Sequence, residues 1–379
     1  MDPKKKFFLF KKSQHFCSVP WNYLKIDTDG VVKTCVKGKT ILGNINNNSI
    51  EEILKNPELK KIRESLYNDQ PTENCSLCRE LDNPEKSYSF LRDMYNDWFK
   101  TSNVDYSDFD TFHLSGIDLH WSSICNIKCI TCWPKQSSAI AKELNIPILS
   151  VSKNRSQEII DWVVSHQHQL KEIYFSGGEP TLIKHNIRLL EKLDPRPDLL
   201  LRVNTNMTFD RQNPFMKEIS RFTNVLVTMS ADALGERFEY IRQGADWQVF
   251  LDNVKWMKDL NYQLRINSVF FVASAQTLME TQQFFKNQFD IDDFTINQCG
   301  MDKNDLLCRN LPDKTKIPII DDLENNLKLP GMRKNFYGQI FNCLAEIKKD
   351  PNELDYKKFF DDIDQRRGTD WKKIFKELL

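Results

Sequence analysis

The sequence has no excess of charge of either sign. Lysine plus arginine and aspartate plus glutamate each total 53, so the formal net charge is zero. A protein that coats a polyanion usually attracts it with a strongly positive surface. The composition therefore argues against that class and gives no signal of a nucleic-acid partner.

Long apolar runs are also absent. The basic start MDPKKKFFLFKK contains only the short apolar run Phe7 to Phe10, and the core of a signal peptide needs roughly 7–15 apolar residues. No later stretch approaches the roughly 20 apolar residues of a membrane span. We therefore expect a cytoplasmic protein without a membrane partner.

The missing export signal decides how the ten cysteines are interpreted. A reducing compartment disfavours disulfides, so grouped cysteines are expected to bind metal. Seven of the ten fall into two groups, Cys17, Cys35, Cys75 and Cys78, and then Cys125, Cys129 and Cys132. The other three, Cys299, Cys308 and Cys343, stand apart, and isolated cysteines are usually small buried hydrophobes.

The second group has a CxxxCxxC spacing within SSICNIKCITCWP, residues 122–134. Thiolates this close in sequence can face one metal centre. Three ligands instead of four would leave one metal position open, which is where chemistry occurs. As an alternative, positions i, i+4 and i+7 share one face of a helix, so the three cysteines could be core residues only.

The first group is assembled by local structure. Residues 23–26 and 31–32 flank Thr28-Asp29-Gly30 and predict a β-hairpin that turns at Asp-Gly. The hairpin places Cys17 and Cys35 at the same end, and the later segment NCSLC adds a CxxC pair. We expect a closed four-thiolate site, which suits structural zinc or a fully ligated iron–sulfur cluster equally well.

From Gly116 onward, strands alternate with amphipathic helices in six units. The predicted strands lie in the segments 116–121, 171–180, 199–206, 224–230, 263–271 and 292–299. Such alternation implies a parallel sheet with right-handed crossovers. We expect an α/β fold, a partial (β/α)6 TIM-like barrel, with a doubly wound sheet as the alternative.

The rest of the chain divides around this barrel. Residues 1–112 are expected to form a small N-terminal α+β cluster-binding domain with its connector, 113–300 the barrel, and 301–379 a helical C-terminal tail. The tail could cover the mouth of the barrel or bind a partner peptide.

Polar residues cluster where the predicted strands end. The cysteine loop follows the first strand, and the later ones carry Ser176–Pro180, Asn204–Asn206, Ser230–Asp232 and Asn267. Each could by itself be a tight turn, a helix-entry charge or a helix cap. Active sites of barrels are built at this edge. The shared position therefore predicts a functional site and disfavours the core-cysteine alternative.

The motif CNIKCITC resembles the cluster motif of radical S-adenosylmethionine (radical SAM) enzymes, and the resemblance extends from Gly116 to about Gly300. It implies that Cys125, Cys129 and Cys132 bind a [4Fe–4S] cluster with SAM at its open iron. SGGEP is similar to the GGE motif of the family, which implies that Gly177, Gly178 and Glu179 hold the amino group of SAM. Asn204, Asn206 and Ser230 match positions that contact its ribose and carboxylate.

The N-terminal segment resembles the twitch or SPASM modules of the same superfamily, although in most relatives that module follows the barrel. The strings DTDGVVKTC, LGNI, SIEEIL and NCSLC carry the resemblance. It implies an auxiliary [4Fe–4S] cluster, in preference to zinc, on Cys17, Cys35, Cys75 and Cys78. Four ligands favour electron transfer or a structural role over direct ligation of substrate.

Together these resemblances imply an oxidoreductase or modifying enzyme. It would cleave SAM reductively to a 5′-deoxyadenosyl radical, abstract a substrate hydrogen, and depend on an external electron donor such as flavodoxin or ferredoxin. We expect a peptide substrate, with a carbohydrate or nucleoside dehydrogenase as the alternative. From a different class, a non-catalytic zinc-binding interaction protein is a further alternative.

Overall fold

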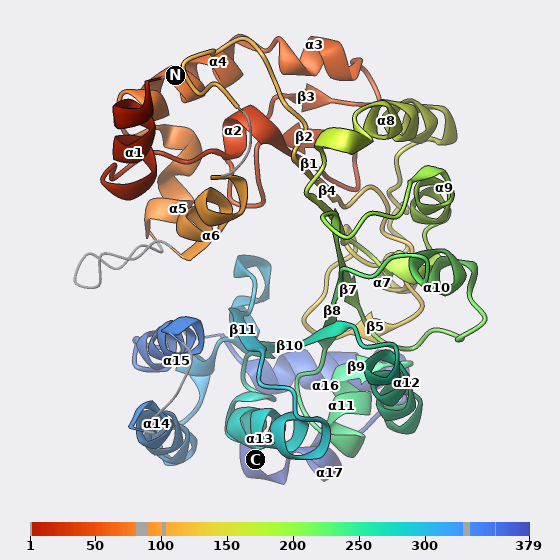
Figure 1. Ribbon diagram of the computed structural model, residues 1–379. Helices are drawn as coiled ribbons and strands as arrows, with labels where there is room; N and C mark the ends of the chain where they lie inside the picture. The colour runs from red at the N-terminus through yellow and green to blue at the C-terminus, as the bar shows by residue number, and fades with distance from the viewer. Residues whose placement is uncertain (1, 81–89, 101–103, 329–333, 353) are drawn as a thin grey trace. The chain divides into compact units, whose positions relative to one another are not determined.

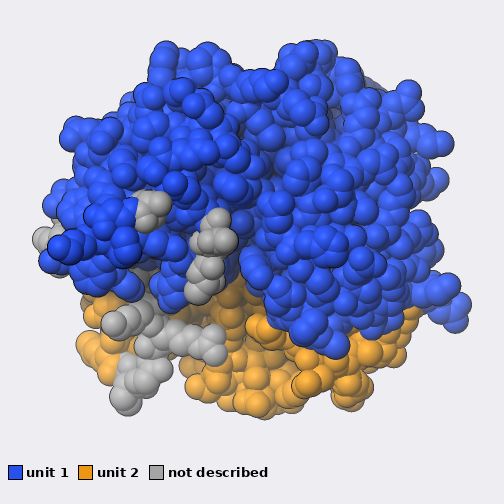
Figure 2. All heavy atoms as spheres, turned by 45° about the horizontal axis from the view of Figure 1, so that its top comes forward, with its two compact units in different colours: residues 1–124, 134–203, 212–225 blue, residues 125–133, 204–211, 226–379 orange. Residues whose placement is uncertain are grey.

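The computed structural model describes residues 2–80, 90–100, 104–328, 334–352 and 354–379 (Figure 1). Contacts within the chain divide it into two compact units (Figure 2). The first comprises residues 1–124, 134–203 and 212–225, and the second comprises 125–133, 204–211 and 226–379. These units are defined by contacts and not by sequence modules, so the boundaries at residues 112 and 300 stay a prediction. Residues 81–89 and 101–103 of the predicted N-terminal domain, and 329–333 and 353 of the predicted tail, lie outside the described residues.

The first unit contains helices and strands in a mixed order, with η marking 3₁₀ helices. Its helices are α1 (Pro3–Lys11), α2 (Val19–Asn22), α3 (Ile50–Leu54), α4 (Pro57–Tyr67), η1 (Glu73–Cys75), α5 (Ser76–Glu80), α6 (Phe90–Phe99), α7 (Ser138–Glu143), α8 (Lys153–Ser165), η3 (Gln167–Gln169), η4 (Pro180–Leu182), α9 (Lys184–Lys192) and α10 (Pro214–Ile219). Its strands are β1 (Tyr23–Ile26), β2 (Val31–Lys33), β3 (Gly43–Asn44), β4 (Gly116–Leu119), β6 (Glu172–Phe175) and β7 (Leu200–Thr205), whose last two residues pass into the second unit.

The second unit begins, apart from two short segments, near the start of β8. Its strands are β5 (Lys128–Cys129), β8 (Val225–Ser230), β9 (Arg242–Gln243), β10 (Gln263–Phe270) and β11 (Phe294–Gln298). Its helices are α11 (Gly235–Ile241), α12 (Trp247–Asp259), η5 (Ala275–Thr277), α13 (Leu278–Phe289), η6 (Met301–Leu306), η7 (Cys308–Asn310), α14 (Asp313–Leu327), α15 (Lys334–Ile347), α16 (Tyr356–Arg367), α17 (Trp371–Ile374) and η8 (Lys376–Leu378). The predicted alternation of six strands with helices is confirmed in chain order, and so is the helical tail.

The N-terminal hairpin continues the parallel sheet of the first unit. In this unit the strand order is β7-β6-β4-β1-β2-β3. The antiparallel pairing of β1 with β2 confirms the predicted hairpin, with Ile26 opposite Val32. On its other side β1 pairs in parallel with β4, from Tyr23 opposite Gly116 to Ile26 opposite Leu119. The N-terminal segment and the start of the predicted barrel are thus joined edge to edge.

Successive side chains of a strand point to opposite faces of the sheet. Apolar and polar residues occupy alternate positions here, so the two faces differ in polarity. One face is apolar, and Phe175 on it meets Phe215 of α10 with ring centroids 5.7 Å apart. Figure 1 shows α8, α9 and α10 in succession along one side of the strands, and neighbours among them are in contact. The opposite face is polar and carries a buried ion pair between Arg202 and Glu172 at 2.6 Å.

Helix α6 packs against the polar face at the start of the strands. Phe99 and Tyr95 of α6 lie 6.1 and 5.1 Å from the ring of Tyr23, and Phe99 and Tyr23 are almost fully buried. A Cβ atom on Gly116 would lie 2.4 Å from Cδ2 of Tyr23 and 3.1 Å from Cζ of Phe99. Only glycine therefore fits at this position, where two parallel strands and a helix meet.

The sheet of the second unit is parallel and shorter. Its order is β11-β10-β8, with Asn267 of β10 opposite Ser230 of β8. A separate two-stranded ribbon pairs β5 with β9 in antiparallel orientation, so that Cys129 lies opposite Arg242. This ribbon holds the predicted cysteine loop in a fixed register.

We predict that Gly116→Ala destabilises the protein by about 1–3 kcal/mol, the usual cost of forcing an extra methyl group into a packed core. Gly300→Ala is the control, because no atom lies within 4 Å of a Cβ added there, and it should stay within about 0.5 kcal/mol of the parent. Urea unfolding followed by circular dichroism measures both. Equal midpoints for the two variants would contradict the packing of β1, β4 and α6.

Candidate functional site

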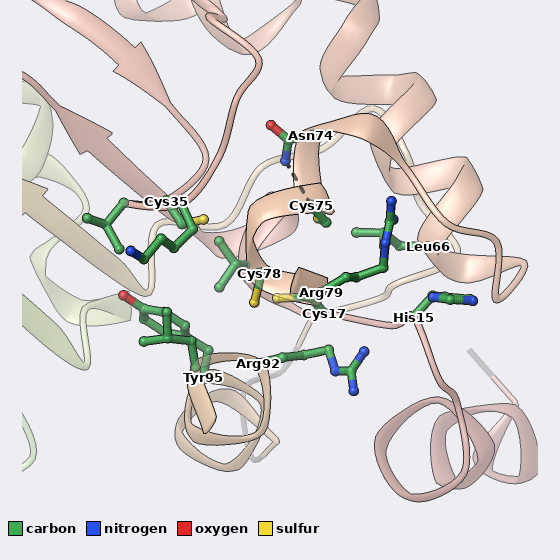
Figure 3. A pocket seen from close by; sticks show the side chains of 14 residues that line it. His15, Cys17, Cys35, Leu66, Asn74, Cys75, Cys78, Arg79, Arg92 and Tyr95 are labelled. Carbon is green, nitrogen blue, oxygen red and sulfur yellow. Dashed lines mark hydrogen bonds between the residues drawn. The ribbon is translucent and has the colours of Figure 1, made fainter. Parts of the chain in front are cut away.

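The four N-terminal cysteines line one pocket of the first unit (Figure 3). The pocket encloses about 570 Å³ of empty space, part of it open to solvent. Cys17 precedes α2, Cys35 follows β2, and Cys75 and Cys78 come from η1 and α5. The hairpin thus brings together thiols that are up to 61 positions apart, counted from residue 17 to residue 78. Their role as ligands stays a prediction.

The electrostatics of this pocket fit a cationic centre. Burial raises the pKa of Cys17 well above its ordinary value, and the neighbouring Cys75, Cys35 and Cys78 raise it further. Burial likewise raises the pKa of Cys75 to about 12, again with help from Cys35 and Cys78. Metal coordination deprotonates such thiols and offsets their mutual repulsion. Among the described residues, no three His, Cys, Asp or Glu side chains have the spacing expected around a single metal ion.

Asn74 supports this pocket and was missed from the sequence. It is 2% exposed, and its Nδ2 donates to Oγ1 of Thr34 at 3.2 Å and lies 3.8 Å from Sγ of Cys75. Its Oδ1 accepts from the amide of Thr40 at 3.0 Å. Asn74 therefore ties the CxxC segment to the loop after the hairpin. The only signal in the sequence is its place directly before Cys75.

Cationic side chains surround the same pocket. Figure 3 shows Arg79 and Arg92 at its edge, and Lys37 lines it too. Arg79 donates to the carbonyl of Thr72 at 2.8 Å, and Arg92 donates to the carbonyl of Gln14. These groups would partly offset the negative charge of a thiolate-bound cluster.

The three cysteines of the second group lie in a turn around the short strand β5. The amide of Cys132 donates to the carbonyl of Cys129 at 3.1 Å, and the amide of Ile130 donates to the carbonyl of Ile241 at 2.9 Å. All three cysteines are partly exposed. The alternative that they share the buried face of a helix is therefore wrong, because the segment pairs with β9 and does not coil.

Arg242 is the second residue that the sequence did not reveal. Its Nη1 donates to Sγ of Cys129 at 3.6 Å, and its Nη2 forms an ion pair with Asp232 at 2.8 Å. Burial raises the pKa of Cys129, while the positive charge of Arg242 lowers it. Burial raises the pKa of Cys132 to about 12, with the charges of Cys129 and Cys125 adding to the effect. Arg242 therefore places a buried cation beside the three-cysteine loop.

The predicted residues at the ends of β7 and β8 lie in the second unit with this loop. Asn206 donates from Nδ2 to Oδ1 of Asn126 at 2.9 Å, and the same Nδ2 lies 4.0 Å from Sγ of Cys125. Asn204 has a buried Oδ1 without a hydrogen-bond partner, and Ser230 is 8% exposed. A buried acceptor without a donor favours a bound ligand at this edge.

The glycine-rich turn after β6 lies in the first unit and contacts the residue before the cysteine loop. The backbone amide of Glu179 donates to the carbonyl of Ile124 at 2.7 Å. Gly178 has φ +44° and a Cβ there would lie 2.2 Å from that same carbonyl oxygen. Ile124 is followed directly by Cys125, so this contact fixes where the loop begins.

Glu179 has a structural task as well. Its side chain is 1% exposed, and Oε1 accepts from the amide and the hydroxyl of Thr181 at 3.2 and 2.8 Å. The carboxylate thus caps η4, which agrees with the helix-entry alternative.

The three remaining cysteines are buried, as expected for isolated thiols. They are not isolated in space, because the charges of Cys343 and Cys299 both influence Cys308. Burial dominates and raises the pKa of Cys308 well above its ordinary value. These residues therefore behave as packed core thiols of the second unit.

Two family models match this chain. Residues 119–282 match the radical SAM superfamily, and residues 17–79 match the SPASM family, an iron-sulfur cluster-binding domain. Residues 119–282 therefore form a radical SAM domain. More specifically, the chain carries its SPASM-type iron–sulfur domain, residues 17–79, before the barrel. The α/β partial-barrel fold is confirmed, and the cofactors are SAM, a SAM-binding [4Fe–4S] cluster and an auxiliary [4Fe–4S] cluster.

Solved structures show a distant likeness. Native anSMEcpe with bound AdoMet and Cp18Cys peptide is 19% identical, covers 56% of this chain and 60% of its own, and has a TM-score of 0.41. Streptococcus suis SuiB bound to precursor peptide SuiA is 12% identical and has a TM-score of 0.42. The match covers 84% of this chain and 71% of the SuiB chain. TYW1 with a lysine-pyruvate adduct bound is 15% identical and has a TM-score of 0.34. The match covers 56% of this chain and 72% of the TYW1 chain.

This chain spans 60% of the length of the anSMEcpe chain. No curated protein sequence matches it. Across the described residues, no helix combines the length and apolar character that crossing a membrane requires.

We predict that Gly178→Ala both destabilises the protein and reduces the iron bound after anaerobic reconstitution, because the clash with Ile124 displaces the start of the cysteine loop. Gly235→Ala is the matched control, since Gly235 has a similar positive φ of +54° but open space around it. The control should lose only the conformational cost of about 1–2 kcal/mol. Iron per chain and the free energy of unfolding are measured for both. Equal losses in the two variants would contradict the contact.

Proposed function

We propose that this enzyme cleaves SAM reductively and uses the resulting 5′-deoxyadenosyl radical to abstract a hydrogen atom from its substrate. The proposal is supported by the turn in which the amide of Cys132 donates to the carbonyl of Cys129, and by the CxxxCxxC spacing with no fourth cysteine beside it in the sequence. Three thiolates suit a [4Fe–4S] cluster with one open iron. When bound and reduced, that cluster supplies the electron that breaks the C–S bond of SAM.

The residues around the loop have separate tasks in this proposal. Glu179 accepts a charge-assisted hydrogen bond from the amino group of SAM, and Gly177 and Gly178 let the backbone approach closely. Asn204 offers its unpartnered Oδ1 to the ribose. Asn206 contributes less to binding SAM, because its side-chain amide already donates to Asn126. Ser230 is the further polar residue that contacts SAM in this proposal.

The auxiliary cluster is assigned to Cys17, Cys35, Cys75 and Cys78. Four thiolates fill the ligand positions of a [4Fe–4S] cluster, so we propose that this site accepts an electron after hydrogen abstraction and does not bind substrate. The pocket lies partly open to solvent beside Arg79 and Arg92, which agrees with exchange of electrons with an external donor such as flavodoxin or ferredoxin.

We further propose that the substrate is a peptide, and that the reaction oxidises or modifies it. The anSMEcpe and SuiB structures contain peptides. A short precursor peptide encoded beside the gene would identify the substrate, and its change in mass after incubation with enzyme, SAM and reductant would define the reaction. A mass change on a sugar or nucleoside instead would favour the dehydrogenase alternative.

We predict that the anaerobically reconstituted protein binds about eight iron atoms, four for each cluster, and forms 5′-deoxyadenosine from SAM with dithionite. Cys132→Ala should reduce this product by more than the 10- to 100-fold typical of changes around a metal ligand. Cys299→Ala is the matched control and should retain the product. A colourless protein that binds zinc and forms no 5′-deoxyadenosine would contradict the enzyme proposal and favour an interaction protein.

We predict a different outcome for the double variant Cys75→Ala, Cys78→Ala. It should lose about half of the bound iron, the share of one four-iron cluster, yet still form 5′-deoxyadenosine with dithionite, because SAM is cleaved at the other site. With the substrate identified, the oxidised product should be absent. Intact product formation in this variant would contradict the electron-transfer role.

A further inference from the structure

Arg242 is a buried cation beside the three-cysteine loop. The residue is 6% exposed, and its guanidinium lies between Cys129 Sγ at 3.6 Å and a carboxylate oxygen of Asp232 at 2.8 Å. Surface arginines are screened by water and salt, whereas buried charges are screened much less. The charge of Arg242 therefore acts strongly on the sulfur that it faces.

The position of this guanidinium is determined from both sides. Asp232 is fully buried, and its second oxygen accepts from the amide of Val269 at 2.8 Å. The backbone of Arg242 is paired with that of Cys129 through the β5–β9 ribbon. Neither end can move without breaking a strand pairing or leaving a buried charge unpaired.

The C-terminal tail adds a second cationic contact to the same loop. Arg367, at the end of α16, donates from Nη1 to the carbonyl of Lys128 at 2.9 Å. Lys303 is a further cation near this loop, because its pKa, which burial lowers overall, is raised by the charge of Cys132. Two arginines thus contact the loop: Arg242 through Sγ of Cys129, and Arg367 of the tail through the carbonyl of Lys128. Asp232 is the acidic group that faces Arg242.

We propose that Arg242 is a positioning residue that holds Cys129 and raises the reduction potential of the cluster that this loop binds. The proposal rests on the proposed function, which assigns a [4Fe–4S] cluster to this loop. One-electron reduction adds a negative charge to the cluster and its thiolates. A buried N–H donor and a buried cation favour that reduced form, because hydrogen bonds to sulfur and net charge set cluster potentials. Arg367 gives the tail a role in holding the loop.

The test is a redox titration of the full-length, anaerobically reconstituted protein, followed by electron paramagnetic resonance with dithionite as the reductant. In the parent protein two cluster signals are expected. In Arg242→Gln one midpoint should fall by at least about 59 mV, which is a tenfold loss of preference for the reduced form in a one-electron couple. The midpoint of the other cluster should not move, and iron per chain should stay the same.

Two variants separate charge from packing. Arg265→Gln removes an arginine of β10 that pairs with Asp293 at 2.9 Å, and it should leave both midpoints unchanged. Arg242→Lys keeps the charge but loses the planar donor geometry, so its fall should be smaller than that of Arg242→Gln. Unchanged midpoints in Arg242→Gln with full iron content would overturn the proposal, and so would equal falls in the two Arg242 variants.

Should Arg242→Gln fail to hold iron, Arg242→Lys decides the question: a lowered midpoint supports the proposal, and an unchanged one overturns it. Loss of iron from both variants, with circular dichroism unchanged, would support the positioning of Cys129 and overturn the effect on potential. The titration needs no SAM. Failure of the parent to form 5′-deoxyadenosine would therefore count against the proposed function while leaving a shifted midpoint to support this inference.

Discussion

The hydrogen bond from the amide of Glu179 to the carbonyl of Ile124 determines where the three-cysteine loop begins. It is 2.7 Å long and is possible only because Gly178 has no side chain to block that carbonyl. Burial raises the pKa of Cys129 and of Cys132, and thiolates repel one another once ionised, so the thiols give the loop little cohesion of their own. The backbone must therefore hold the loop in place. The Glu179 contact does so before Cys125, and the β5–β9 ribbon does so at Cys129.

The parallel pairing of β1 with β4 attaches the N-terminal segment to the sheet of the first unit. Cys17 is separated from β1 only by the short helix α2, and Cys35 lies two residues beyond β2. Both cysteines are thus attached to strands of one continuous sheet in the first unit. A domain placed before the barrel therefore reaches the sheet through β4, the first strand of the barrel. The sheet therefore positions two of the four cysteines that line the auxiliary pocket.

Local patterns predicted the fold well, and long-range contacts explain what they missed. The hairpin at Asp29-Gly30, the strand–helix alternation and the CxxC pair each depend on residues close in sequence. The pairing of β1 with β4 joins segments about 90 residues apart, and no periodicity within either strand encodes its partner. Arg242 is 113 positions from Cys129, so the sequence could reveal the cysteine but not the cation beside it. The spacing left the helix-face alternative open and the position at the strand ends disfavoured it, but only the pairing of β5 with β9 excludes it.

The two cysteine sites differ in how their surroundings treat negative charge. After burial, the largest influence on Cys17 is the charge of another thiol, Cys75. After burial, the largest influence on Cys129 is the opposite charge of Arg242. The cations around the auxiliary pocket lie at its partly solvent-open edge, where screening weakens them. A cluster bound in the three-cysteine loop would therefore be easier to reduce than a cluster in an identical loop without Arg242.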